Sequence, residues 1–192
     1  FRAADGSGGM HAVLNAKCTA PTLCENNYPE NAGLQQVIDF VAPTYAKYSA
    51  ELSVSDFWAL AANIALDFST LPVNARATVT PLSSSPFKFR WGRKDGVATD
   101  SLPQSRFPSA ESAWPAIKAI FVTGMGLTAT ETTALLGAHS IGRLNPLNSG
   151  YSGPWDNQPA VFDNGYFTSM INRKWTFNRV ADGRAGVTGT VS

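Results

Sequence analysis

The stretch that decides the fold is residues 124–143, GMGLTATETTALLGAHSIGR. Its first glycines end one helix, and Thr128 can cap the next because Glu131 stands three residues later, the spacing of a capping box. Gly142 supplies a stop signal for that second helix. The pattern predicts a helix with His139 near its C-terminal end. Its inner face is expected to carry small and apolar residues, namely Ala134, Leu135, Ala138 and Ile141.

Helical periodicity recurs on both sides of this stretch, so the predicted fold class is mostly α. The pattern predicts helices at 31–48, where Pro43 should kink or end the helix, and from Ser53, which can cap a helix with Asp56 as its partner. Two more are expected after Pro108 and at 163–175. Residues 67–109 lack a clear period, residues 178–192 are expected to be frayed, and only ARATVTP at 75–81 alternates like a strand.

Length and charge exclude several classes of protein. The chain has 192 residues and a net charge of +1, which suits one domain over 1–192 and argues against a polybasic nucleic-acid-binding protein. No apolar run reaches the roughly 20 residues of a membrane span. Charged residues make up 15%, against roughly 25% in typical soluble domains, so part of the surface is expected to be covered by a partner or by further chain. The first residue is Phe1 rather than Met, which indicates a processing site or the edge of a fragment.

The two cysteines, Cys18 and Cys24, lie six residues apart in a loop-like segment. They are either free thiols or a short-loop disulfide, and a disulfide would indicate an oxidising compartment. A zinc site is not expected, because four ligands are needed and His11 is the only nearby histidine.

A second segment, GYSGPWDNQPAVFDNGYF at 150–167, follows the His139 helix. Together the two segments resemble the proximal half of plant- and fungal-type haem peroxidases, most closely the branch that includes ascorbate peroxidase and cytochrome c peroxidase. Other stretches resemble the family in the same order along the chain: ADGSGG at 4–9, ENAGLQQVIDFVAPTYAKY at 30–48, SVSDFWALAANIAL at 53–66, WGRKDG at 91–96 and RFPSAES at 106–112.

The resemblance implies a two-lobed helical fold with haem b between the lobes, residues 1–110 forming the distal lobe and 111–192 the proximal lobe. His139 matches the axial ligand of the haem iron, whereas a lone histidine on an apolar helix is more often a core residue. Trp155 matches the indole that packs on the proximal haem face and that carries electrons in some members; the alternative is a core indole. Asn31 matches the asparagine that orients the distal histidine, and its alternative role is a helix cap. The resemblance places the WGRKDG region at the haem edge, where three cations would contact an anionic donor or a haem propionate, the alternative being plain surface charges: Arg90, Arg93 and Lys94.

The resemblance also implies a proximal cation site. Its oxygen ligands would be Ser140, Asp156, Gln158 and Asp163, with Ca²⁺ favoured and K⁺ as the alternative. If no cation binds, the two carboxylates cap and solvate the loop and the following helix.

The sequence departs from the family pattern at both ends. The distal His and Arg are expected before Ala4, Asp5 and Ser7 match only part of a distal calcium site, and Asp182 stands in the wrong context to be the aspartate partner of the axial histidine. The leading hypothesis is reduction of hydrogen peroxide with an organic or protein electron donor, as in ascorbate peroxidase. The alternative is a catalytically weak or inactive accessory subunit docked in a larger protein complex. An organellar location would fit a processed N-terminus and a disulfide.

Overall fold

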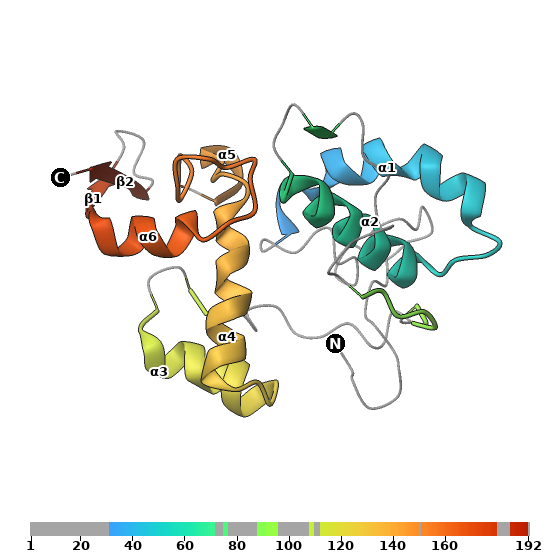
Figure 1. Cartoon of the computed structure of the whole chain (residues 1–192), viewed down its shortest axis with the longest axis horizontal. Coiled ribbons are helices and arrows are strands. Elements are labelled where there is room, and N and C mark those ends of the chain that lie inside the picture. The colour runs from blue at the N-terminus through green and yellow to red at the C-terminus, as the bar shows by residue number, and fades with distance from the viewer. Residues whose placement is uncertain are drawn as a thin grey trace. The chain divides into compact units, whose positions relative to one another are not determined.

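The computed structural model describes residues 31–71, 75–76, 88–95, 108–109, 112–149, 151–179 and 185–191. The chain divides into two compact units. The first is Phe1–Phe68 with Thr78–Gln104, and the second is Ser69–Ala77 with Ser105–Ser192. Most described elements are helices, which confirms the mostly α fold class (Figure 1). The division into a distal lobe of residues 1–110 and a proximal lobe of residues 111–192, with haem between them, stays a prediction.

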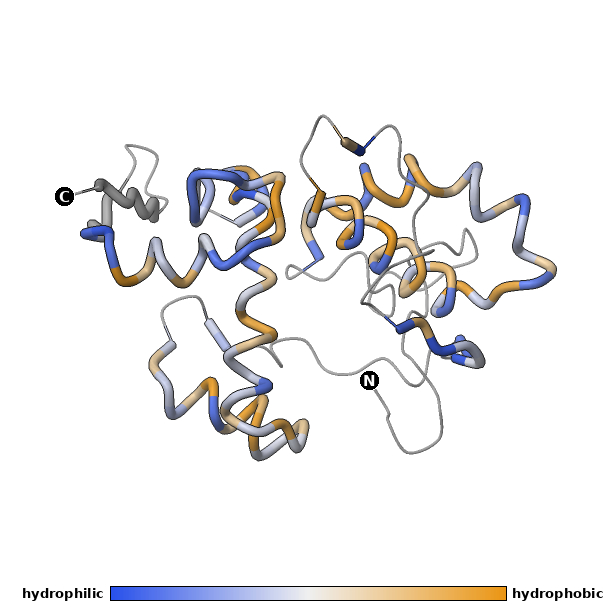
Figure 2. Tube along the Cα trace, viewed as in Figure 1, coloured by the Kyte–Doolittle hydropathy of each residue, from blue (hydrophilic) through white to orange (hydrophobic). Residues whose placement is uncertain are grey.

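The first unit contains helices α1 (Leu34–Tyr48) and α2 (Val54–Ser69), the last residue of α2 belonging to the second unit. Ile38 and Phe57 are buried, and the rings of Tyr45 and Phe57 lie 5.0 Å apart between centroids. Both helices carry apolar stretches interrupted by polar residues (Figure 2), as expected for helices that bury one face. Pro43 does not end α1, which continues to Tyr48.

The structure tests the capping roles expected for Ser53, Asp56 and Asn31. The Ser53 hydroxyl accepts a hydrogen bond from the Asp56 backbone N–H at 3.0 Å, so Ser53 caps α2 as predicted. The Asp56 carboxylate does not complete a capping box, because it is bound to the loop at 88–95. Asn31 does not cap α1, since the residue that precedes the helix is Gly33.

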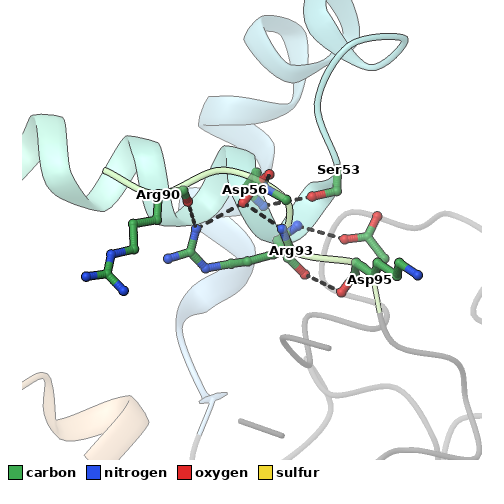
Figure 3. A network of polar contacts seen from close by, with 8 residues as sticks. Ser53, Asp56, Arg90, Arg93 and Asp95 are labelled. Carbon is green, nitrogen blue, oxygen red and sulfur yellow. Dashed lines mark hydrogen bonds and ion pairs between the residues drawn. The ribbon is translucent and has the colours of Figure 1, made fainter. Parts of the chain in front are cut away.

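The loop at 88–95 is fastened to the start of α2 by two carboxylates (Figure 3). Asp56, only 5% exposed, accepts hydrogen bonds from Gly92 N at 2.8 Å and from Arg93 Nη1 at 3.0 Å. Asp95 accepts from the backbone N–H groups of Val54 and Ser55 at 3.0 and 2.8 Å. The second carboxylate therefore occupies the N-terminus of α2, where unpaired N–H groups favour negative charge.

The second unit begins its described helices with α3 (Trp114–Ile117), which continues as a π-helical segment (Lys118–Gly124) around the buried Phe121. Then come α4 (Ala129–Leu136), a 3₁₀ turn (Gly137–Ser140), α5 (Pro146–Ser149) and α6 (Gly165–Asn172). The helix expected at 163–175 is therefore shorter at both ends, and α5 lies in a stretch that was expected to be loop.

The C-terminal segment contains two paired strands rather than a frayed end. Strands β1 (Arg173–Arg179) and β2 (Ala185–Val191) pair antiparallel, with Arg173 opposite Val191. Because β2 is rich in glycine and threonine, its alternation of apolar and polar side chains is weak. Pairing with β1 therefore determined that this segment is a strand.

Within the described ranges, no single helix has the length and apolar composition of a membrane span. Trp114–Gly124 and Ala129–Ser140 meet those criteria only as a pair, joined across a 112° bend.

Candidate functional site

The helix that carries His139 has the termini that its sequence predicts. Thr128 accepts a hydrogen bond from Glu131 N at 3.1 Å, and the Glu131 carboxylate accepts from Thr128 N at 2.8 Å, so the capping box is complete. After Leu136 the chain tightens into the 3₁₀ turn, and Gly142 follows with φ at 90°, a left-handed conformation that favours glycine. His139 therefore lies in the last turn, beside the point where the chain reverses.

The inner face of α4 differs from the predicted one. Thr132 and Ser140 are fully buried, Gly137 is also buried, and Leu135 is 51% exposed. Ala134 and Ala138 are exposed as well, so the helix buries a different face from the predicted one. Phe167 of α6 packs directly on Gly137, which explains why the small residue faces inward.

The imidazole of His139 has one nitrogen bound and lies against two rings. Its Nδ1 is 2.9 Å from the carbonyl oxygen of Leu136, which can only accept, so Nδ1 carries the proton of this hydrogen bond. The neutral imidazole then has its lone pair on Nε2, the form that binds a metal. The ring centroid of Trp155 lies 4.6 Å from that of His139, and the ring centroid of Tyr166 lies 5.3 Å away.

Trp155 reaches His139 because the intervening chain folds back on itself. Leu144 N donates to Gly153 O at 2.9 Å, and Gly153 N donates to Leu144 O at 3.4 Å. This isolated bridge closes the loop that contains α5, and Gly153 has φ at 100° at the turn out of it. The bridge returns residue 155 to the end of α4, although it stands 16 positions further along the chain.

Three of the four predicted cation ligands converge beside His139. Ser140 Oγ lies 2.7 Å from Asp156 Oδ2 and 3.0 Å from Asp163 Oδ1. Ser140 is fully buried and Asp156 is 2% exposed, whereas Asp163 is exposed. Gln158 takes part through its backbone N–H, which donates to Asp156 Oδ1 at 2.8 Å, and its side chain is exposed.

In this cluster two carboxylates share one hydroxyl proton and have no Lys or Arg partner among the described residues. One hydroxyl has one proton to donate, yet Ser140 Oγ lies within hydrogen-bond distance of two carboxylates. A Cβ atom added at Gly165 would lie 2.7 Å from an oxygen of each carboxylate, which shows how closely Asp156 and Asp163 approach. Within the described part of the chain, neither carboxylate forms an ion pair with Lys or Arg, and no group of three or more His, Cys, Asp or Glu side chains has a metal-binding arrangement. Two carboxylates with neutral oxygens around them fit a hard cation.

Tyr166 is a neighbour of His139 that the sequence placed only on the apolar side of a helix. It lies in the first turn of α6, and burial raises the pKa of its phenol above the ordinary value. The sequence signal for this contact was the position of Tyr166 three residues after Asp163. That spacing places both residues at the N-terminal end of α6.

The remaining predicted residues lie elsewhere. Asn31 belongs to the first unit, and its expected role beside haem stays a prediction. Arg93 pairs with Asp56 at 3.0 Å, and the expectation that it contacts an anionic donor or a propionate stays a prediction. Arg90 and Lys94 are exposed, and Figure 3 shows the Arg90 side chain directed away from the Asp56 network. Expectations for several residues fall outside the described ranges: Asp5, Ser7, His11, Cys18, Cys24 and Asp182.

Comparison with known proteins gives a consistent result. A family model described as peroxidase matches residues 8–182. A mitochondrial cytochrome c peroxidase of Aspergillus fumigatus is 35% identical over 183 residues, which cover 95% of this chain and 44% of the relative. The cytosolic L-ascorbate peroxidase 1 of Oryza sativa subsp. japonica is 30% identical over 154 residues, which cover 80% of this chain and 55% of the relative. The chain spans about half the length of the curated relatives it matches.

Proposed function

Since the chain belongs to the peroxidase family, within the plant and fungal haem peroxidase superfamily, we propose that its protein reduces hydrogen peroxide at a haem b held by His139. The observation that supports this assignment most directly is the state of the imidazole: Nδ1 is bound to the Leu136 carbonyl, so Nε2 is the nitrogen left for a ligand. When bound, haem supplies the iron that exchanges electrons with peroxide. The residues described here supply the ligand and its surroundings.

The Nδ1 hydrogen bond would set the donor strength of His139 as well as its orientation. A partner that accepts the Nδ1 proton makes the other nitrogen a stronger electron donor, and a carboxylate does so more than a carbonyl. Leu136 provides a neutral carbonyl oxygen in this position. The proposal therefore includes an axial histidine of moderate electron-donor strength, positioned by its own helix.

Trp155 is proposed to support the proximal side of the haem and to carry electrons from a donor. Its ring centroid lies 4.6 Å from that of His139, and an indole in contact with the axial ligand is close enough to exchange electrons with the centre. The electron donor is an organic molecule or a protein. The names of the two relatives provide the donors to assay, cytochrome c and ascorbate.

A first experiment tests haem binding by His139. The sequence contains two histidines, so His11→Ala is a control of the same chemistry at a different position. We expect hemin titration to give a histidine-ligated Soret spectrum for the wild type and for His11→Ala, and a changed spectrum for His139→Ala that added imidazole restores. An unchanged spectrum for His139→Ala would show that this histidine is not the axial ligand.

A second experiment tests turnover with each donor. Hydrogen peroxide loss is followed with ascorbate or with reduced cytochrome c, and His139→Ala sets the background. Trp155→Phe keeps an aromatic ring and removes the indole. The fold decrease in the rate with the protein donor should therefore exceed the fold decrease in haem affinity. Haem-loaded protein that consumes no peroxide with either donor would contradict the proposed function.

We also propose a cation, Ca²⁺ in preference to K⁺, held by Ser140, Asp156 and Asp163, with Gln158 as a further oxygen ligand. The shared hydroxyl proton and the close approach of two carboxylates support this site. Chelator should lower the melting temperature of the wild type and have little effect on Asp156→Asn, in which the loss of charge weakens the site. A wild-type melting temperature that neither chelator nor added Ca²⁺ or K⁺ changes would argue that the carboxylates only cap the loop and helix.

A further inference from the structure

The aromatic rings that contact His139 indicate that a neighbouring residue positions its imidazole. A hydrogen bond from Nδ1 fixes one atom of the imidazole, but it leaves the ring plane free to rock about that atom. The contacts that limit the plane are rings, and the described structure places two of them against His139. Trp155 lies at 57° to the imidazole, whereas Tyr166 lies at 32°, closer to a stacked arrangement.

Tyr166 is itself held in place from α6. Its ring makes an edge contact with Phe167, with 5.2 Å between the centroids. Phe167 in turn packs on Gly137, where an added Cβ atom would lie 3.0 Å from Phe167 Cε2. The first turn of α6 is thus fitted against the same 3₁₀ turn that carries His139 (Figure 1).

The contribution of Tyr166 comes from its ring rather than from its hydroxyl. Tyr166 is partly buried, and within the described ranges its hydroxyl makes no hydrogen bond. Replacing the tyrosine by phenylalanine should therefore preserve the contact with the imidazole. Replacing it by leucine keeps an apolar side chain but removes the flat ring.

We propose that Tyr166 is a positioning residue, whose ring holds the His139 imidazole in the plane that keeps Nδ1 on the Leu136 carbonyl and turns Nε2 outward. This inference rests on the proposed function, because the outward nitrogen matters only if it binds iron. Its structural part can be measured without haem.

The experiment measures the tautomer of His139 in the haem-free chain by long-range ¹H–¹⁵N NMR, with His11→Ala used to assign the signals. In the wild type and in Tyr166→Phe we expect the Nδ1–H form to predominate. In Tyr166→Leu the Nε2–H form should rise to a comparable population. Met170→Ala is the matched control, because Met170 is 52% exposed on the same helix and should leave the tautomer unchanged.

The same variants loaded with hemin give a second reading, the iron–histidine vibration of the ferrous form. Tyr166→Leu should broaden or shift this band, while Tyr166→Phe and Met170→Ala should match the wild type. A wild-type tautomer ratio in Tyr166→Leu would overturn the positioning role and leave haem binding untouched. Failure of the wild type to bind hemin would instead overturn the proposed function, and the tautomer data would still decide the role of Tyr166.

Discussion

Removing the buried carboxylate of Asp56 should destabilise the first unit. The Asp56→Ala variant loses three hydrogen bonds to loop 88–95: from Gly92 N at 2.8 Å, from Arg93 N at 3.3 Å and from Arg93 Nη1 at 3.0 Å. Hydrogen bonds to a charged group contribute about 1.5–3 kcal/mol each, and breaking a buried ion pair costs about 3–5 kcal/mol. The Arg93 side chain is 30% exposed, so water recovers part of that loss. We expect Asp56→Ala to lower the free energy of unfolding by about 2–4 kcal/mol.

The assay is urea unfolding followed by far-UV circular dichroism. With a slope of about 2 kcal/mol per molar urea, the expected loss corresponds to a midpoint shift of about 1–2 M. Asp56→Asn keeps one oxygen acceptor and should lose less. Glu51→Gln is the matched control, since it neutralises an exposed carboxylate in the turn before α2. An Asp56→Ala midpoint within error of that control would refute the reasoning.

The same carboxylate predicts a pH dependence. Burial raises the pKa of Asp56, but hydrogen bonds from Gly92 and Arg93 and the Arg93 charge lower it by more, so the net pKa lies below its ordinary value. A carboxyl whose folded-state pKa is depressed stabilises the fold above the unfolded-state pKa of about 4. That contribution is lost as the pH falls through the lower folded-state value. The stability gap between the wild type and Asp56→Asn should therefore narrow below about pH 4; a constant gap in urea midpoints down to pH 2 would contradict this account.

Three further changes test the second unit. Thr128→Ala removes the N-cap of α4 and should cost about 1 kcal/mol in urea unfolding, whereas Thr128→Ser should be nearly neutral. Gly137→Ala places a methyl group against Phe167 and should cost about 1–3 kcal/mol, part of which Phe167→Leu should restore; equal losses in the single and double variants would exclude that clash. Gly165→Ala pushes a methyl group between the two carboxylates and should abolish any Ca²⁺-dependent rise in melting temperature; an unchanged rise in calorimetry would place the cation elsewhere.

The local features of α4 were determined by sequence alone. Thr128 and Glu131 complete a capping box, and Gly142 follows the helix end with a positive φ, because these interactions join residues within about one helical turn. Ser53 caps α2 for the same reason. Spacing along the chain is sufficient information when both partners lie on one turn.

Tertiary structure decided the features that join distant residues. The Ser53–Asp56 spacing resembles a capping box, yet the Asp56 carboxylate binds Gly92 and Arg93, 36 and 37 positions away, because a buried charge needs strong donors that its own helix does not supply. The approach of Tyr166 to His139 and the pairing of β1 with β2 likewise depend on where the chain returns. Spacing along the chain cannot specify such returns, because each one depends on which surfaces pack together and on which buried polar groups must be paired.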